Sequence, residues 1–351
     1  MLRCSSRHHK TGLRLPDISA LNGTAIANLA EVDGLTVSGG GSSFTGLLDQ
    51  TYGTGAAAAY SVRRLSSSTG ALIRVRRVTG VGNTGNDDEA DFSYDSNNEL
   101  SLNSPISNAD AGVNSTTLGS FLNVGTVSGV TYPDTDSLSN TAEGYCDSWY
   151  DQSGNNNDAT QSTPGSQPQI HSGTVNTDLI TENGKPTLEF DGADDHFPID
   201  TSASGLNLNV NNTSSFHVGK YDVTTNGIIL SLGGSSPSAR WYPGYFNVSL
   251  LRYGYSGNSS ISTETGNTNQ NQWSMIAGST LAGAEAWRNG SSKMTATLAS
   301  SQIMGDSVGI GRYRTSYYLN GNVQEVLIWD SDQSSNRTDI ENNMNSHFQI
   351  Y

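Results

Sequence analysis

Short apolar runs bounded by glycine recur through the second half of the chain. They lie at residues 227–232, 245–251, 272–277, 308–312 and 320–329, and each predicts a β-strand. The segment 284–294 contains Asn289-Gly290, a dipeptide typical of two-residue hairpin turns. Strands spaced this regularly, with turn residues between them, indicate an all-β sandwich.

Other patterns occur outside these runs. Residues 71–78 alternate aliphatic side chains with arginines, which predicts a half-buried strand. The alanine-rich run 54–65 favours a short helix. Residues 335–348 predict an amphipathic helix, because apolar side chains recur at every fourth position on one face: Ile340, Met344 and Phe348.

The first 43 residues differ from the rest of the chain. Residues 1–17 carry four of the eighteen basic residues, which indicates an arm that docks onto something acidic; a frayed terminus would have the same composition. A short repeat then places Asn22-Gly23 and Asp33-Gly34 between apolar pairs and predicts two hairpins. Residues 38–43 are a glycine- and serine-rich flexible linker. We therefore predict a docking arm with its linker at 1–43 and a sandwich at 44–351.

Composition excludes several classes of protein. The chain has 351 residues and a net charge of −15, which argues against a nucleic-acid binder because phosphate contacts need clustered Lys and Arg. No apolar run reaches the roughly 18 residues of a membrane-spanning helix. Its two cysteines, Cys4 and Cys146, are too few for a disulfide-stapled scaffold.

The charges are unevenly distributed. Between Arg77 and Lys185 there is no Lys or Arg but there are fifteen Asp and Glu, which form either a solubilising surface or cation-binding loops. Five arginines make the dense basic patch of the predicted sandwich. We expect them to form ion pairs with the acidic loops rather than to bind a ligand. They are Arg63, Arg64, Arg74, Arg76 and Arg77.

An aromatic strand end near the middle of the chain runs into a turn. The residues are Trp149, Tyr150, Asp151, Gln152, Ser153 and Gly154, followed by an Asn/Asp cluster that ends at Asp158. Asp, Asn, Ser and Gly accept turn dihedrals and hydrogen-bond their own backbone, so we expect an ordered turn that is capped by Asp151. About thirty residues on, 183–192 supplies a second turn, a short strand and another turn.

Together with 59–65 and 70–77, these two stretches resemble the catalytic sandwich of fungal α-L-arabinofuranosidase B. They also resemble concanavalin-like, laminin-G-like domains on virion proteins of bacteriophages, especially marine ones. The resemblance covers roughly residues 45–351. It implies an all-β, concanavalin A-like (jelly-roll) β-sandwich with a short C-terminal helix, preceded by an extended N-terminal docking arm.

The resemblance also implies a role. It indicates a bacteriophage structural protein on the virion surface, as a tail-fibre, tail-associated or head-decoration component. The expected partners are other virion proteins, further copies of this chain (a trimer, by analogy with fibres) and a host-surface glycan. Neither nucleic acid nor membrane insertion is expected.

Glycoside hydrolysis needs two positioned carboxyl groups. The resemblance implies that the nucleophile is a Glu on a strand in the middle of the domain. It also implies that the general acid is an Asp that follows two glycines late in the domain. The segments that look equivalent, 245–248 with Asn247 and 309–313, contain no carboxylate, and the adjacent cysteine pair of the arabinofuranosidases is also missing. An amide cannot replace a carboxylate nucleophile. We therefore expect no catalytic residues and no enzyme activity. An arabinofuranosidase-like glycoside hydrolase is the alternative.

Metal and cofactor motifs are weak. Asp191, Asp194 and Asp195 cluster beside His196, and carboxylate oxygens of such loops can bind Ca²⁺. The regular ligand spacing of a dedicated Ca²⁺ loop is missing. We expect no cofactor and no metal, with Ca²⁺ as the open alternative.

Aromatic residues gather in the late loops. Sugars are held by aromatic faces together with amide and hydroxyl side chains. We therefore predict a glycan site at Trp241, Tyr242, Tyr245, Tyr253, Tyr313 and Tyr317. The alternative is that these rings pack the sandwich or a subunit interface, as in a capsid cement protein that binds no ligand.

Overall fold

A computed structural model describes residues 44–351, apart from 201–204, 223–225, 234–240, 247–249, 256–257, 266–267, 279–282, 298–303, 305–307 and 314–316. Before residue 44 it describes four short strands. The chain divides into two compact units, Met1–Phe44 and Thr45–Tyr351. None of the helices described is long and apolar enough to cross a membrane.

The four short strands of the first unit form two hairpins: β1 (Ala20–Leu21) with β2 (Thr24–Ala25), and β3 (Glu31–Val32) with β4 (Leu35–Thr36). In each pair two residues lie between the strands, at 22–23 and 33–34. The two predicted Asn-Gly and Asp-Gly hairpins are confirmed. The predicted arm 1–17 and linker 38–43 lie outside the described residues.

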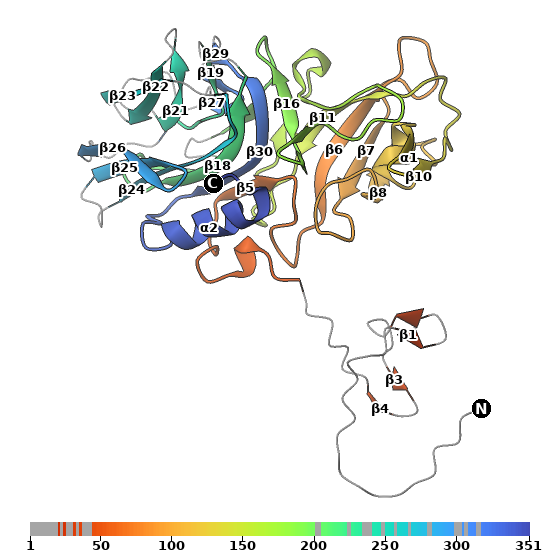
Figure 1. Cartoon of the computed structure of the whole chain (residues 1–351), viewed down its shortest axis with the longest axis horizontal. Coiled ribbons are helices and arrows are strands. Elements are labelled where there is room, and N and C mark those ends of the chain that lie inside the picture. Colours follow the sequence, from red (N-terminus) through yellow and green to blue (C-terminus); the bar gives the residue numbers. More distant parts are fainter. Residues whose placement is uncertain are drawn as a thin grey trace, which may run out of the picture. The chain divides into compact units, whose positions relative to one another are not determined.

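The second unit is built on one large antiparallel sheet (Figure 1). Its strand order is β26-β25-β24-β18-β30-β16-β13-β11-β6-β7-β8, with β5 beside β30 and β12 beside β11. The strands are β5 (Ala58–Ser61), β6 (Ala71–Val78), β7 (Glu89–Ser93), β8 (Ile106–Ala109), β11 (Glu143–Trp149), β12 (Ala159–Thr160), β13 (Gln169–Ser172), β16 (Leu188–Asp191), β18 (Ser214–Tyr221), β24 (Asn271–Gly278), β25 (Gly283–Arg288), β26 (Ser291–Thr297) and β30 (Asn320–Trp329).

Two smaller sheets form the second layer of the sandwich. One has the order β17-β27-β28-β29 with β20 beside β27, and the other has the order β19-β21-β22-β23. Their strands are β17 (Phe197–Ile199), β19 (Asn226–Ile228), β20 (Leu230–Ser231), β21 (Trp241–Phe246), β22 (Leu250–Tyr255), β23 (Asn258–Thr265), β27 (Val308–Ile310), β28 (Arg312–Tyr313) and β29 (Tyr317–Tyr318). Across the layers, Trp241 Nε1 donates a hydrogen bond to Ser215 Oγ of β18 at 2.8 Å.

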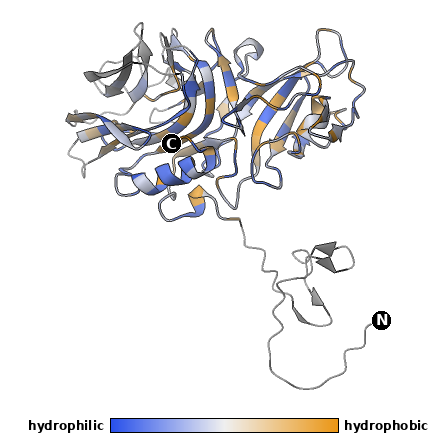
Figure 2. Cartoon of the chain, in the orientation of Figure 1, coloured by the Kyte–Doolittle hydropathy of each residue, from blue (hydrophilic) through white to orange (hydrophobic). Residues whose placement is uncertain are grey.

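The remaining elements are short. Two hairpins pair β9 (Gly125–Val127) with β10 (Val130–Tyr132) and β14 (Thr181–Glu182) with β15 (Lys185–Pro186). The α-helices are α1 (Leu118–Phe121) and α2 (Arg337–Phe348), and two 3₁₀ turns occupy Leu47–Asp49 and Pro164–Ser166. Along β11 and β16, buried residues alternate with half-buried or exposed ones, so one face of these strands meets the core. Strands β18, β24 and β30 are buried along nearly their whole length. Figure 2 shows hydrophobic and hydrophilic residues along the strands of the large sheet.

The predicted closing helix is confirmed. Helix α2 packs beside β24 and buries Ile340, Met344 and Phe348. The hairpin at Asn289-Gly290 is also confirmed, since Arg288 pairs with Ser291 and the two turn residues have φ values of 51° and 71°. These positive φ values are those of the turns that match strand twist.

Two kinds of expectation are wrong: the type of one element and the continuity of three strands. The run 227–232 spans the end of β19 and all of β20, and 308–312 spans β27 and the start of β28. The alanine-rich run 54–65 contains strand β5, which pairs with β30, because the fully buried Ala58 and Ala59 lie in the tightly packed sheet centre and tertiary packing outweighs helix propensity. The predicted single strand 245–251 is instead the end of β21 and the start of β22. These strands pair with each other, so a connection interrupts the apolar run.

Candidate functional site

Four adjacent strands place a row of polar side chains across one face of the large sheet. The cross-strand partners are Arg76 with Tyr145, Tyr145 with Gln169, and Gln169 with Glu189. Directly paired residues of antiparallel strands project from the same face. The intervening residues, such as Cys146 and Leu188, are fully buried in the core. The row therefore lies on the outer, polar face of β6, β11, β13 and β16.

This row forms the floor of a cleft of about 630 Å³, a volume typical of small-ligand sites. Residues from β16, from the segment after β18 and from the start of β30 complete one side, and residues before β13 complete the other. The lining residues are Arg76, Val78, Glu143, Tyr145, Pro164, Gly165, Gln167, Gln169, Glu189, Phe190, Asp191, Asp195, Asp222 and Asn320. We call this feature the acidic cleft.

Two loops that border the acidic cleft are joined to each other. Ser166 Oγ donates to Asp194 Oδ2 at 2.8 Å, and the His196 backbone N–H donates to the Ser166 carbonyl at 3.2 Å. Gln161 Nε2 donates to the His196 carbonyl at 2.9 Å. These bonds connect the segment before β13 with the segment after β16. The edge of the acidic cleft is therefore formed by two loops that are hydrogen-bonded to each other.

Arg76 is fixed at one end of the row. Its guanidinium donates to Gln167 Oε1 at 2.7 Å, to Asp87 Oδ1 at 2.8 Å and to the Pro164 carbonyl at 3.0 Å. The same group lies 5.3 Å from the centre of the Tyr145 ring, which is a cation–π distance. Tyr145 is thereby held on the floor of the cleft.

Tyr145 also connects the amide and carboxylate groups of the floor. Its hydroxyl donates to Glu143 Oε2 at 3.0 Å and lies 3.4 Å from Gln169 Nε2. Burial, supported by the hydrogen bond to Glu143, raises the pKa of Tyr145 to about 12. The phenol therefore stays protonated at neutral pH and presents a half-buried ring beside hydrogen-bonding groups.

Two carboxyl groups of the acidic cleft hold protons unusually tightly. Burial raises the pKa of Asp195 to about 7, and the negative charges of Asp191, Asp194 and Glu189 add to the shift. Burial and the charge of Asp222 also raise the pKa of Glu189. Asp195 is only 6% exposed. The cleft thus contains two carboxyl groups, Asp195 and Glu189, whose pKa values are raised by burial and by neighbouring acids.

The aspartate cluster that was considered as an alternative Ca²⁺ site lies at the acidic cleft. One oxygen or more from each of Asp191, Asp194 and Asp195 falls within 4.8 Å of the others. Asp191 Oδ1 accepts backbone N–H groups of the turn, including that of Ala193 at 2.8 Å, and Asp195 Oδ2 accepts the Asp191 N–H at 3.0 Å. These bonds close the turn through protein groups.

The central motif, residues 149–154, forms a structural clasp between the turn after β11 and strand β5. Asp151 Oδ1 accepts the backbone N–H groups of Ala59 at 2.8 Å and Ser153 at 2.9 Å, and its Oδ2 accepts that of Asn157 at 3.0 Å. The predicted turn-capping role of Asp151 is confirmed. The sequence did not reveal that the cap also holds strand β5.

Gln152 extends this clasp into the core. Its Oε1 accepts from Leu65 N at 2.8 Å and Thr69 Oγ1 at 3.0 Å, and its Nε2 donates to the carbonyls of Ser61 and Arg63 at 3.1 and 3.0 Å. The other motif residues support the turn. Trp149 is fully buried, and the Tyr150 hydroxyl donates to Asp91 Oδ1 at 2.7 Å. Ser153 Oγ donates to Asp151 Oδ2 at 2.8 Å, and Gly154 has a φ of 88°.

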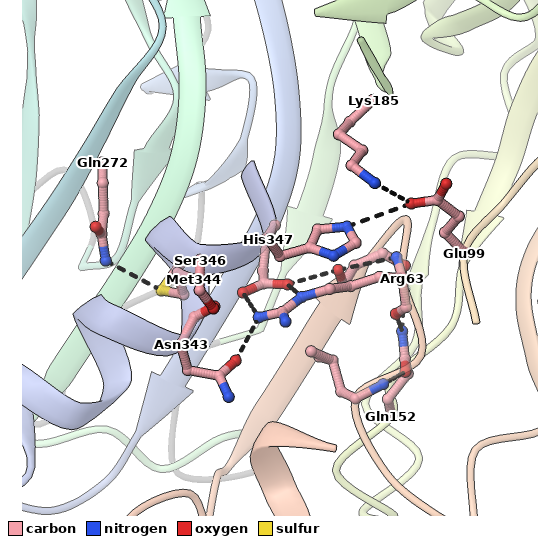
Figure 3. A network of polar contacts seen from close by, with 12 residues as sticks. Arg63, Glu99, Gln152, Lys185, Gln272, Asn343, Met344, Ser346 and His347 are labelled. Atoms are coloured by element: carbon pink, nitrogen blue, oxygen red, sulfur yellow. Dashed lines mark hydrogen bonds and ion pairs between the residues drawn. The ribbon is translucent and has the colours of Figure 1, made fainter. Parts of the chain in front are cut away.

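Beyond Gln152 the clasp meets a buried ion pair and helix α2 (Figure 3). Arg63 donates to both oxygens of the fully buried Glu325, at 2.7 and 2.9 Å, and also to Asn343 Oδ1 of α2 at 2.9 Å. Nearby, Lys185 donates to Glu99 at 2.7 Å. Strand β5, strand β30 and α2 are therefore connected through one polar network.

The expectation that the arginine patch forms ion pairs with the acidic loops is confirmed for three of its five members, whereas Arg63 pairs with Glu325 of β30. Arg74 contacts Glu89, Asp91 and Asp110; Arg76 contacts Asp87; and Arg77 contacts Asp88 and Asp136, all at 2.6–3.1 Å. All six of these acids come from the stretch between Arg77 and Lys185, which has no basic residue of its own. The acidic stretch thus neutralises the arginines of β6.

The aromatic residues predicted to bind sugar lie mainly in the core. Trp241 and Tyr253 are fully buried, and Tyr242 and Tyr313 are 4% and 3% exposed. Tyr317 is half-buried beside Tyr313, and the side chain of Tyr245 lies outside the described residues. Rings this deeply buried expose no face to a sugar. We therefore place the candidate site at the acidic cleft instead. Asn247, which occupies the position expected for the Glu nucleophile, lies outside the described residues.

Sequence reasoning missed Glu143, Tyr145, Gln169 and Glu189 as a group. Each belongs to a strand in which polar residues alternate with buried ones, and this alternation was the available signal. The cross-strand register that brings Tyr145, Gln169 and Glu189 into one row was not visible in the sequence. Local pattern alone could therefore identify a polar face but not a site.

No protein-family model matches the chain, and no curated protein sequence matches it. Among solved structures, a mutant GH54 α-L-arabinofuranosidase soaked with 4-nitrophenyl α-L-arabinofuranoside is similar, with a TM-score of 0.50 and 14% identity over 82% of this chain and 62% of that one. An arabinofuranosidase complexed with arabinofuranosyl-α-1,2-xylobiose gives 0.49, with 15% identity over 82% and 62%. Domain 4 of a GH43 extracellular arabinanase from Geobacillus stearothermophilus, in complex with arabinotriose, gives 0.36, with 14% identity over 45% and 77%.

The first of these likenesses supports the fold. The large antiparallel sheet, the second layer and the short C-terminal helix form a concanavalin A-like β-sandwich, as predicted. This chain matches less than two thirds of that enzyme's length, 62%. Fold alone does not fix an activity. The class defined here is a β-sandwich related in fold to a carbohydrate-active enzyme, with an acidic cleft on its large sheet.

Proposed function

We propose that the chain is a glycan-binding protein displayed on the surface of a bacteriophage particle, with the acidic cleft as its sugar site. The observation that carries the binding proposal is the row Arg76, Tyr145, Gln169 and Glu189 on the floor of the cleft. An aromatic ring flanked by amide and carboxyl groups matches the requirements of a saccharide, which needs an apolar platform and many hydrogen bonds.

The virion location is supported by the motifs at 149–154 and 183–192, which resemble those of phage structural proteins. We propose that other virion proteins and further copies of this chain are its partners, through residues 1–43. Cryo-electron microscopy of the intact particle tests this location. Density for the sandwich at the tail or head supports the proposal, and a particle that lacks the chain refutes it.

Glycan binding is tested separately on an array of immobilised oligosaccharides. The variant Tyr145→Ala removes the ring of the cleft, and Tyr317→Ala makes the same change at one of the late aromatic residues. Because an aromatic contact contributes about 0.5–1.5 kcal/mol, we expect Tyr145→Ala to weaken binding by about two- to tenfold and Tyr317→Ala to leave it unchanged. The opposite result would place the site at the late aromatic residues. No binding by the unmodified chain would refute the function.

Glycoside hydrolysis is a second candidate, favoured by one observation. Asp195 has a pKa of about 7 and shares the acidic cleft with Glu189, so a proton donor and a carboxylate are both present. Release of 4-nitrophenol from a panel of 4-nitrophenyl glycosides tests it. Turnover that disappears in both Asp195→Asn and Glu189→Gln would establish hydrolysis at the cleft. An absence of turnover leaves binding as the function.

A further inference from the structure

Charge distinguishes the acidic cleft from an ordinary polar groove. Its lining includes five carboxyl groups and one guanidinium. The carboxyl groups belong to Glu143, Glu189, Asp191, Asp195 and Asp222. The acidic side chains of the lining outnumber the single basic one by five to one. A ligand that enters the cleft therefore meets a negative potential.

The guanidinium of Arg76 is not available to balance these charges. The residue is 6% exposed, and its donors are already directed at Gln167, Asp87 and the Pro164 carbonyl. Three of the five N–H donors of Arg76 are used in these bonds, and the remaining two belong to a residue that is almost fully buried. An anion in the cleft therefore has little access to the guanidinium.

Most of the acids also lack a cationic partner. Lys220 pairs with Glu182 at 2.9 Å and with Asp222 at 3.2 Å. Across the described part of the chain, no ion pair involves the other four cleft acids. The side chain of Asp195 is nearly buried. Within the described part of the chain, its carboxyl group accepts one hydrogen bond, from the Asp191 N–H. The charge of Lys220 also acts on Glu189 and lowers its pKa. The negative charges of Asp191 and Glu189 nevertheless raise the pKa of Asp195, and a bound cation would relieve this repulsion.

We propose that the acidic cleft selects cationic saccharides, namely glycans with free amino groups, over neutral and acidic glycans. This inference rests on the proposed glycan-binding function and assigns its ligand class. The Tyr145 ring and the amides of Gln167, Gln169 and Asn320 provide contacts for sugar rings and hydroxyls. The carboxylates provide partners for an ammonium group. A uronic or sialic acid would add a negative charge to a site that is already negative.

The test compares three saccharides of equal length with the full chain by isothermal titration calorimetry at pH 6. They are a tetramer of glucosamine, a tetramer of N-acetylglucosamine and a tetramer of galacturonic acid. Amino groups with pKa values of about 8 are protonated at this pH. We expect the glucosamine tetramer to bind at least about tenfold more tightly than its N-acetylated counterpart. We also expect this advantage to shrink between low and high salt, because exposed charge interactions are screened.

Two variants locate the effect. Glu189→Gln removes one charge from the cleft, and Glu285→Gln makes the same change on β25, outside it. We expect Glu189→Gln to reduce the preference for the amino sugar by about two- to fivefold, as for a partly exposed ion pair, and Glu285→Gln to leave it unchanged. If Glu189→Gln unfolds at a lower urea concentration than the unmodified chain, Glu143→Gln replaces it.

Each failure has a distinct meaning. Equal affinity for the glucosamine and N-acetylglucosamine tetramers would overturn the charge selectivity but leave glycan binding intact. Binding of tetralysine as tight as that of the glucosamine tetramer would show charge attraction without sugar recognition, and would also overturn the proposal. If no saccharide binds here or on the array, the proposed function itself fails and the ligand class with it.

Discussion

The clasp at Gln152 gives the sharpest test of how the sandwich is held together. The side chain is 6% exposed and takes part in four hydrogen bonds, which connect the turn after β11 with the segment that follows β5. Gln152→Ala removes all four and leaves the buried Leu65 N–H without its acceptor. A buried group that loses its partner costs about 1–3 kcal/mol, and each lost bond about 0.5–1.5 kcal/mol.

We therefore expect Gln152→Ala to lower the free energy of unfolding by about 3–5 kcal/mol, less than the plain sum because water can enter the space left behind. Urea unfolding followed by tryptophan fluorescence measures the change. The control is Gln169→Ala, the same substitution at a half-buried position with one long side-chain contact of 3.4 Å, which should cost less than about 1 kcal/mol. A loss below about 1 kcal/mol for Gln152→Ala would show that the clasp does not hold β5.

Three further predictions follow from charges and turns. Because the pKa of Asp195 rises from 3.8 to about 7 on folding, the native state binds its proton more tightly, and this contribution to stability, present below pH 4, is lost as the pH rises to 7. Urea unfolding should therefore show that the free energy of unfolding of the unmodified chain falls between pH 5 and pH 8. Asp195→Asn should make this fall smaller by about 1–2 kcal/mol, a value discounted for solvent screening. The same fall in both proteins would show that Asp195 does not titrate in this range. Arg77→Leu leaves Asp136 buried without its 2.6 Å partner, so the free energy of unfolding should fall by about 3–5 kcal/mol; Arg64→Leu, in the same patch but partly exposed, should cost far less. Gly290→Ala should cost about 1 kcal/mol because φ is 71°, whereas Gly70→Ala, with open space and no positive φ, should cost little; equal costs would argue against the turn.

The sequence predicted the sandwich because its signals are local. Turn dipeptides such as Asn289-Gly290 restrict the backbone directly, and the spacing of Ile340, Met344 and Phe348 fixes one face of α2. Asp151 was correctly assigned to the turn for the same reason. In each case the interaction that decides the structure lies within a few residues of the signal.

The candidate site could not be predicted in this way. Its floor depends on pairings between β6, β11, β13 and β16, whose residues are separated by long stretches of chain. The alanine-rich segment illustrates the same limit, since Ala58 and Ala59 favour a helix locally and become a strand only through β30. Aromatic residues such as Trp241 suggested a sugar platform because sequence does not reveal burial.

The partnership of β5 and β30 has a consequence for how the domain is made. Ser61 and Glu325 are hydrogen-bonded although 264 residues separate them along the chain. During synthesis at about 5–20 residues per second, β5 leaves the ribosome at least about ten seconds before its partner. The centre of the sheet therefore closes last, after translation of nearly the whole domain. Until then the edges of β5 and β18 are open to pairing with other chains, so high expression at elevated temperature should favour aggregation over folding.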